Sequence, residues 1–187
     1  MKENPWTVSN VLSASRILLM APVVYFFLSP MEHNREYAVF FTLLAVTTDA
    51  LDGYFARLFH QESELGKVID PLADKIGVGI VVVLLLIFGD IPLWFALLVL
   101  CRDIVIFLGG LYIRKRTRII LPSNMAGKFA VSFVALTLVL SMVHYRIFSL
   151  LQVISLDVSV VLLVFSFIVY VMRFTVVLST EKNKTHS

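Results

Sequence analysis

The stretch DALDGYFARLFHQESELGKVIDPLAD, residues 49–74, decides how the rest of this sequence is interpreted. It contains the four aspartates Asp49, Asp52, Asp70 and Asp74, and it lies against or inside apolar runs about as long as a bilayer crossing. An ionised carboxylate is among the least favourable side chains to place in hydrocarbon. Four carboxylates so close together therefore require a chemical reason.

The composition places the 187-residue chain among membrane proteins. Hydrophobic residues make up 59% and charged residues 16%, with a mean hydropathy of +0.90, whereas a soluble domain is about half apolar and a quarter charged. Cys101 is the only cysteine, so no intramolecular disulfide can form. The first apolar stretch lacks a small-residue cleavage site, and we expect it to be retained as a helix. We expect membrane lipid, and no nucleic acid, among the partners.

Six long apolar segments predict an all-α, polytopic membrane protein with six transmembrane helices. Pro30, Pro92 and Pro122 stand at the breaks between segments, as helix-ending residues should. We expect one membrane domain over residues 1–187, with a short interfacial segment, NPWTVSNVLSASR, before the first crossing. The segments cover about residues 11–29, 37–58, 69–89, 91–113, 125–145 and 154–179.

The distribution of Lys and Arg predicts the orientation in the membrane. Alternate loops on one side hold only Arg35 and Arg146. The positive-inside rule therefore places both termini and the aspartate stretch at the cytoplasmic face of the cytoplasmic membrane. The flanks on that cytoplasmic side hold nine cations: Lys2, Arg57, Lys67, Arg114, Lys115, Arg116, Arg118, Lys182 and Lys184.

The spacing of the aspartates predicts a metal site. Asp49 and Asp52 are three residues apart, and Asp70 and Asp74 are four apart, so each pair shares one face of a helix. A short link makes the two helices antiparallel neighbours, and both pairs can face one space. Converging carboxylates repel one another in a low dielectric. Divalent cations relieve that repulsion, and we expect two ions, Mg²⁺ or Mn²⁺.

Small and basic residues beside the aspartates suit a phosphate-containing ligand. Gly53 and Ala56 allow a flat ligand to approach the backbone, and Gly66 allows the third helix to begin close to the second. Arg57 is placed to pair with a carboxylate or with a phosphate. A purely structural role is a reasonable alternative for one intramembrane aspartate, but not for four in two facing pairs.

The same stretch resembles the signature of the CDP-alcohol phosphotransferase family. That signature reads D-x-x-D-G-x-x-A-R, then eight residues, then G-x-x-x-D-x-x-x-D, and every fixed position and the gap match here. The motif covers 26 residues, while the six-helix layout of the family covers the whole chain.

The resemblance implies a role for each matching residue. Asp49, Asp52 and Asp70 would bind metal, and Asp74 would complete the metal site and act as general base. The acceptor hydroxyl would attack the β-phosphorus of a CDP-linked lipid, CDP-diacylglycerol, and CMP would leave. The resemblance also implies a homodimer. The implied CDP-binding residues are Asp49, Asp52, Gly53, Ala56, Arg57, Gly66 and Asn10.

Further residues bear on the acceptor. NVLSASRI resembles the N-L-L-T-L-L-R-I of phosphatidylglycerophosphate synthases, with Asn10, Ser13 and Arg16 at the matching places. The acceptor would then be glycerol 3-phosphate, whose dianionic phosphate needs a cationic pocket. The candidates are Arg102, Arg114, Arg116, Arg118 and Lys128. For Arg102, an ion pair with the neighbouring Asp103 is an equally good interpretation.

Other assignments remain open. AGKFAVSF departs from the G-K-x-K-T of those synthases at Ala130 and Val131, and CRDIVIFLGGLYIRKR is nearer to cardiolipin synthases, whose acceptor is phosphatidylglycerol. A membrane prenyltransferase would separate its two acidic motifs by a longer stretch. A divalent-cation carrier would need polar groups along the depth of the membrane. The glycines of LGGLY, residues 108–112, are better explained by close helix packing than by phosphate binding.

Overall fold

The computed structural model describes residues 8–59, 66–117, 125–143 and 145–185, with side chains described over 18–48, 74–115, 125–143 and 145–179. All the secondary structure in these ranges is helical, which confirms the all-α prediction. The long helices are α1 (Val8–Leu28), α2 (Asn34–Phe59), α3 (Gly66–Ile87), α4 (Leu93–Thr117), α5 (Met125–Met142) and α6 (Ser149–Thr185), and a short 3₁₀ turn, η1 (Arg146–Phe148), precedes α6.

Each predicted apolar segment corresponds to one long helix, within a few residues at most ends. Within the residues whose side chains are described, three stretches are long and apolar enough to cross a membrane: α4 over Leu93–Lys115, α5, and η1 with α6 over Arg146–Ser179. In the described part of α1, the apolar stretch Leu18–Leu28 is shorter than a crossing. The count of six crossings therefore stays a prediction. So does the interfacial segment, whose residues from Val8 onward belong to α1 and whose earlier residues lie outside the described range.

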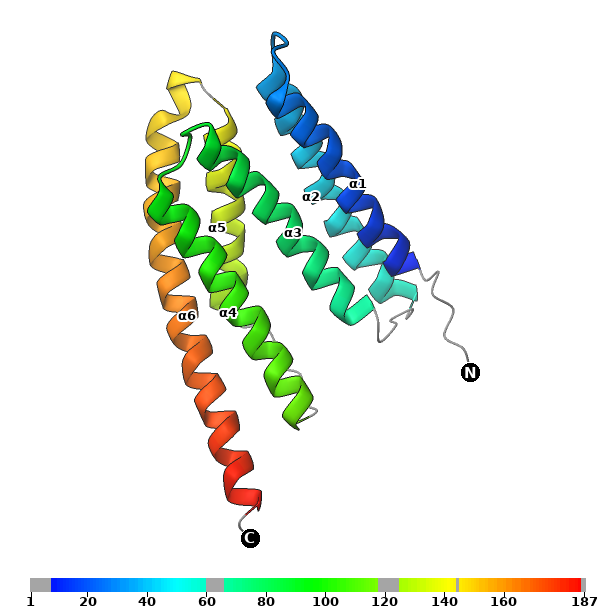
Figure 1. Cartoon of the computed structure of the whole chain (residues 1–187), viewed down its shortest axis with the longest axis vertical. Coiled ribbons are helices and arrows are strands. Elements are labelled where there is room, and N and C mark those ends of the chain that lie inside the picture. The colour runs from blue at the N-terminus through cyan, green and yellow to red at the C-terminus, as the bar shows by residue number, and fades with distance from the viewer. Residues whose placement is uncertain (1–7, 60–65, 118–124, 144, 186–187) are drawn as a thin grey trace. The chain divides into compact units, whose positions relative to one another are not determined.

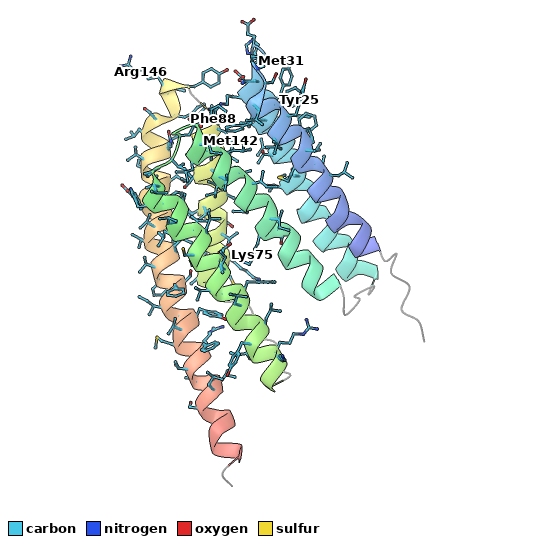
Figure 2. All side chains as sticks on the ribbon, viewed as in Figure 1. Tyr25, Met31, Lys75, Phe88, Met142 and Arg146 are labelled. Carbon is cyan, nitrogen blue, oxygen red and sulfur yellow. The ribbon has the colours of Figure 1, made fainter. Side chains whose placement is uncertain are left out.

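The chain divides into two compact units, residues 1–90 with 141–144 and residues 91–140 with 145–187. In the first unit α1 packs against both α2 and α3 (Figure 1). Figure 2 labels Tyr25 and Met31 near the turn from α1 to α2, and it labels Lys75 in the first half of α3. In the second unit α4 packs against α6. The prediction of one domain over the whole chain stays a prediction.

The turn between α1 and α2 is tight. The Asn34 side chain donates to the carbonyl of Ser29 at 2.7 Å, which satisfies a carbonyl left free beyond the end of α1. His33 adopts a left-handed backbone with φ of 62°, a conformation that a non-glycine residue rarely takes outside a turn. Pro30 lies in this turn and Pro92 immediately precedes α4, as predicted, while Pro122 lies outside the described residues.

An ion pair holds the first unit together at the end where α1 and α3 finish. Arg35 of α2 donates to a carboxylate oxygen of Asp90 at 2.6 Å, and only 6% of the Asp90 side chain is exposed. The guanidinium carbon of Arg35 also lies 4.1 Å from the ring centroid of Phe27 and 4.9 Å from that of Phe88. Charge pairing and cation–π contact together fix the three helices at this end.

The second unit contains buried polar contacts between its helices. Tyr170 of α6 donates from its hydroxyl to the carbonyl of Ile106 in α4 at 3.0 Å. A Cβ built on Gly109 would stand 2.5 Å from that hydroxyl, whereas one on Gly110 would meet nothing within 4 Å. The prediction of close helix packing is therefore confirmed for Gly109, and Gly110 takes no part in it.

Candidate functional site

The aspartate positions of α2 continue the buried face of that helix. Ala38, Thr42 and Ala45 are buried and are spaced at four and three residues, as one stripe of an α-helix requires. Continuing by four and three residues reaches Asp49 and Asp52, in the last turns of α2. Both positions therefore lie on the helix face that is buried nearer the start of α2.

The aspartate positions of α3 follow the same rule from the opposite direction. Gly77, Val81 and Leu84 form a buried stripe, and stepping back by three and four residues reaches Asp74 and Asp70. Both lie near the beginning of α3. The two aspartate pairs thus occupy positions in register with the buried stripes of α2 and α3, at one end of the first unit.

Helix α1 is the element that joins the two aspartate-bearing helices. The sulfur of Met20 lies 3.7 Å from where a Cβ on Gly77 would stand, and the Phe27 and Phe88 rings are 5.2 Å apart, edge to face. Met20 lies against residue 77 and Phe27 against residue 88. Residue numbers therefore rise in the same direction along both helices, and α1 and α3 run parallel. Among the described contacts, α1 packs more extensively on α2 and on α3 than those two helices pack on each other.

The predicted site residues are placed by their helices. Gly53, Ala56 and Arg57 lie in α2, Gly66 begins α3, and Asn10 lies near the start of α1. Their side chains are outside the described set, as are those of Asp49, Asp52 and Asp70, whereas Asp74 is described and exposed. Among the side chains that are described, no group of three or more acidic, histidine or cysteine residues forms a metal site.

The placement of the carboxylates is compatible with a divalent metal. Four carboxylate residues occupy positions in register with the buried stripes of two helices that both pack on α1, and hard cations such as Mg²⁺ take oxygen ligands. The metal site and its two-ion occupancy remain predictions.

Arg102, the first acceptor candidate, is buried in α4 and already has partners. Its guanidinium donates to Asp103 at 2.6 Å and to the Ser166 hydroxyl of α6 at 2.9 Å, while its Nε is buried with no hydrogen-bond partner. The predicted ion-pair alternative is therefore confirmed. Ser166 could not be identified from sequence, because it lies 64 residues away and nothing in a run of apolar helix marks it.

The acceptor candidates at the end of α4 lie apart from Arg102 on the same helix. Arg114 is half-buried at the basic end of α4, 12 residues or about 18 Å along the helix from Arg102. Arg116 also belongs to the end of α4, and Lys128 is exposed near the start of α5. Arg118 lies outside the described residues. Arg102 and the basic end of α4 are therefore separate candidates for binding an acceptor phosphate.

Comparison with known proteins gives consistent matches. Residues 6–171 match the CDP-alcohol phosphatidyltransferase family. The chain is 34% identical over 173 residues to the CDP-diacylglycerol–glycerol-3-phosphate 3-phosphatidyltransferase of Aquifex aeolicus, a match that covers 89% of this chain and 94% of that protein. It is 37% identical over 113 residues to the protein of the same name from Cereibacter sphaeroides, covering 57% and 49%.

A second group of relatives carries another name. The chain is 41% identical over 116 residues to the human cardiolipin synthase (CMP-forming). That match covers 62% of this chain but only 38% of the human protein, so the chain spans little more than a third of it. Because the family match extends over most of the sequence and includes both aspartate pairs, this chain belongs to the CDP-alcohol phosphatidyltransferase family.

Proposed function

We propose that this protein transfers a phosphatidyl group from CDP-diacylglycerol to a hydroxyl acceptor and releases CMP. The observation that carries the proposal is the complete signature of residues 49–74, whose two aspartate pairs continue the buried faces of two helices packed on α1. Family membership and the names of the relatives over most of the chain support it.

The proposed chemistry assigns each aspartate a task. Asp49, Asp52 and Asp70, with Asp74, would bind two Mg²⁺ or Mn²⁺ ions, which when bound offset the negative charge of the diphosphate. The carboxylate of Asp74 takes the proton of the acceptor hydroxyl. The acceptor oxygen then forms a bond to the β-phosphorus, and the bond from that phosphorus to the oxygen bridging to CMP breaks. CMP leaves with the electron pair of that bond.

Cytidine diphosphate recognition is assigned to residues around the first aspartate pair. Gly53 and Ala56 lack bulk on α2 and allow the nucleotide to approach the backbone, and Arg57 supplies a cation for a phosphate. Gly66 at the start of α3 and Asn10 of α1 complete the proposed set.

Glycerol 3-phosphate is the proposed acceptor. The relative from Aquifex aeolicus, whose name specifies that acceptor, matches over 89% of this chain, whereas the human cardiolipin synthase matches over 62%. The second candidate acceptor is phosphatidylglycerol, which the similarity to cardiolipin synthases supports.

We further propose six membrane crossings, a homodimer, and a site that faces the cytoplasm from the cytoplasmic membrane. The asymmetry of Lys and Arg supports this orientation. Exposed Tyr and Trp side chains are typical of either membrane interface. In the first unit Tyr25 and Tyr37 are exposed at the end remote from the aspartates. In the second, Trp94 is exposed at the end of α4 opposite to Arg114 and Lys115.

An acceptor panel tests the proposed function. Purified protein is incubated with CDP-diacylglycerol and Mg²⁺ and with glycerol 3-phosphate, phosphatidylglycerol or an uncharged alcohol, and CMP and the lipid product are measured. We expect CMP release that depends on glycerol 3-phosphate. Absence of CMP with every acceptor, together with Mg²⁺ flux into liposomes, would instead support a cation carrier.

A further inference from the structure

Helix α1 has a cation at a position in register with the face that packs on its neighbours. Met20, Val23 and Phe27 are buried, at 5%, 0% and 1% exposure, and form one stripe of α1. Stepping back four residues from Met20 reaches position 16, which is an arginine. Arg16 therefore continues the buried stripe in register, just as the aspartates continue the stripes of α2 and α3.

The contacts of α1 with α3 set the level of Arg16 along the bundle. The two helices are parallel, and Met20 contacts Gly77. Arg16 lies four residues before Met20, and Asp74 lies three residues before Gly77, so each is about one turn earlier on its helix. The backbone positions of Arg16 and Asp74 are therefore level with each other.

The contacts of α1 with α2 give the same level independently. The Phe26 ring lies 5.1 Å from that of Tyr37 and 5.5 Å from that of Phe41. The tight turn after α1 makes α2 antiparallel to it. Arg16 lies ten residues before Phe26 on α1. Asp49 lies ten residues beyond residue 39, the midpoint of Tyr37 and Phe41 on α2. Each backbone position is therefore about 15 Å along its helix from the aromatic contact. Arg16 is thus level with one aspartate of each pair.

The charge balance of the proposed site gives a reason for a second cation beside the diphosphate. Four aspartates and two divalent cations balance, so a diphosphate bound to the metals adds uncompensated negative charge, one on each phosphate. Arg57 on α2 supplies one cation, and Arg16 is a second. Charged hydrogen bonds to phosphate are strong, and they are stronger still where water is excluded.

We propose that Arg16 of α1 is a diphosphate-binding residue, placed by helix register level with Asp49 and Asp74. The inference rests on the proposed function, since it takes the CDP-linked lipid as the ligand. It adds a charged residue of α1 to a site whose other charged residues come from α2 and α3. It also gives α1 a second substrate-binding residue, besides the proposed Asn10.

Nucleotide binding to the full-length protein in detergent with Mg²⁺ tests the proposal without turnover. Calorimetry measures Kd for CDP and for cytidine, which lacks the diphosphate, in wild type, Arg16→Gln and Arg16→Lys. We expect Arg16→Gln to raise Kd for CDP about tenfold to a hundredfold and to leave Kd for cytidine unchanged. Arg16→Lys retains the charge and should lie between the two. In turnover assays KM for CDP-diacylglycerol should rise and KM for the acceptor should not.

Arg35→Gln is the matched control, because it removes an arginine from the same unit at the end remote from the aspartates. It should lower Tm and leave Kd for CDP unchanged. Unchanged CDP affinity in a folded Arg16→Gln protein would overturn the proposal. Equal losses of affinity for CDP and for cytidine would also overturn it. So would a changed Mg²⁺ concentration requirement with unaltered CDP affinity, which would mean that Arg16 only balances the charge of the carboxylates. If wild type binds no CDP, the proposed function falls as well.

Discussion

Met20 of α1 lies against Gly77 of α3, with its sulfur 3.7 Å from the position that a Cβ on Gly77 would take. This contact is one turn from Asp74, so it sets how closely α1 approaches the aspartate end of α3. The separation of these two helices is therefore controlled by the size of the side chain at position 77.

A large side chain at position 77 should push α1 and α3 apart, whereas a single methyl group should fit. A Cβ at 3.7 Å makes an ordinary contact, so Gly77→Ala should be neutral or should stabilise α3 by up to about 1 kcal/mol. Gly77→Leu overfills the contact and should destabilise the protein by about 1–3 kcal/mol. Thermal unfolding in detergent measures both, and equal Tm values for the two variants would contradict the predicted contact.

The neighbouring glycines of α4 should respond differently to the same substitution. Gly109→Ala forces the Tyr170 hydroxyl from its bond to the Ile106 carbonyl and should lower stability by about 1–3 kcal/mol. Gly110→Ala meets open space and should not lower stability. In Tyr170→Phe the obstructing hydroxyl is gone, so adding Gly109→Ala should cost less than it does in wild type. Additive losses would argue against this contact.

Helix register explains both what the sequence predicted and what it did not. Apolar length predicted every long helix, and the aspartates lie within α2 and α3 as their spacing predicted, while the convergence of the two pairs stays a prediction. The Arg35–Asp90 pair could not be predicted, because its members are 55 residues apart and no local pattern joins them. The alignment of Arg16 with the aspartates likewise depends on contacts between helices, such as Met20 with Gly77, that no local pattern encodes.

The acceptor prediction concerns the cations outside the signature. If the acceptor is glycerol 3-phosphate, replacing at least one of the five candidate cations by Ala should raise the acceptor KM about tenfold to a hundredfold, since a charged hydrogen bond contributes about 1.5–3 kcal/mol. The five are Arg102, Arg114, Arg116, Arg118 and Lys128. KM for CDP-diacylglycerol should hardly change. Arg102→Ala should also lower Tm, because it leaves Asp103 without its buried cation.

An unchanged acceptor KM in the Ala variants of all five cations would exclude glycerol 3-phosphate as the acceptor. Phosphatidylglycerol or an uncharged alcohol would then take its place, with the chemistry of the aspartates unaffected.

The orientation can be measured with single cysteines in a Cys101→Ser background. A cysteine at position 60 should react from the cytoplasmic side, because Arg57 and Lys67 flank that loop. A cysteine at position 33, in the turn after α1, should react only from the opposite side. Labelling of position 60 from outside alone would reverse the orientation of the site.

Metal-dependent CMP release from CDP-diacylglycerol tests the central claim, that the four aspartates carry the chemistry, most directly. With glycerol 3-phosphate and Mg²⁺, we predict release by wild type, none in EDTA, and none by Asp49→Asn or Asp70→Asn. Asp74→Asn should abolish turnover while retaining at least part of the affinity for CDP, because its missing group acts on the proton. Full release in EDTA, or by Asp49→Asn, would contradict the claim.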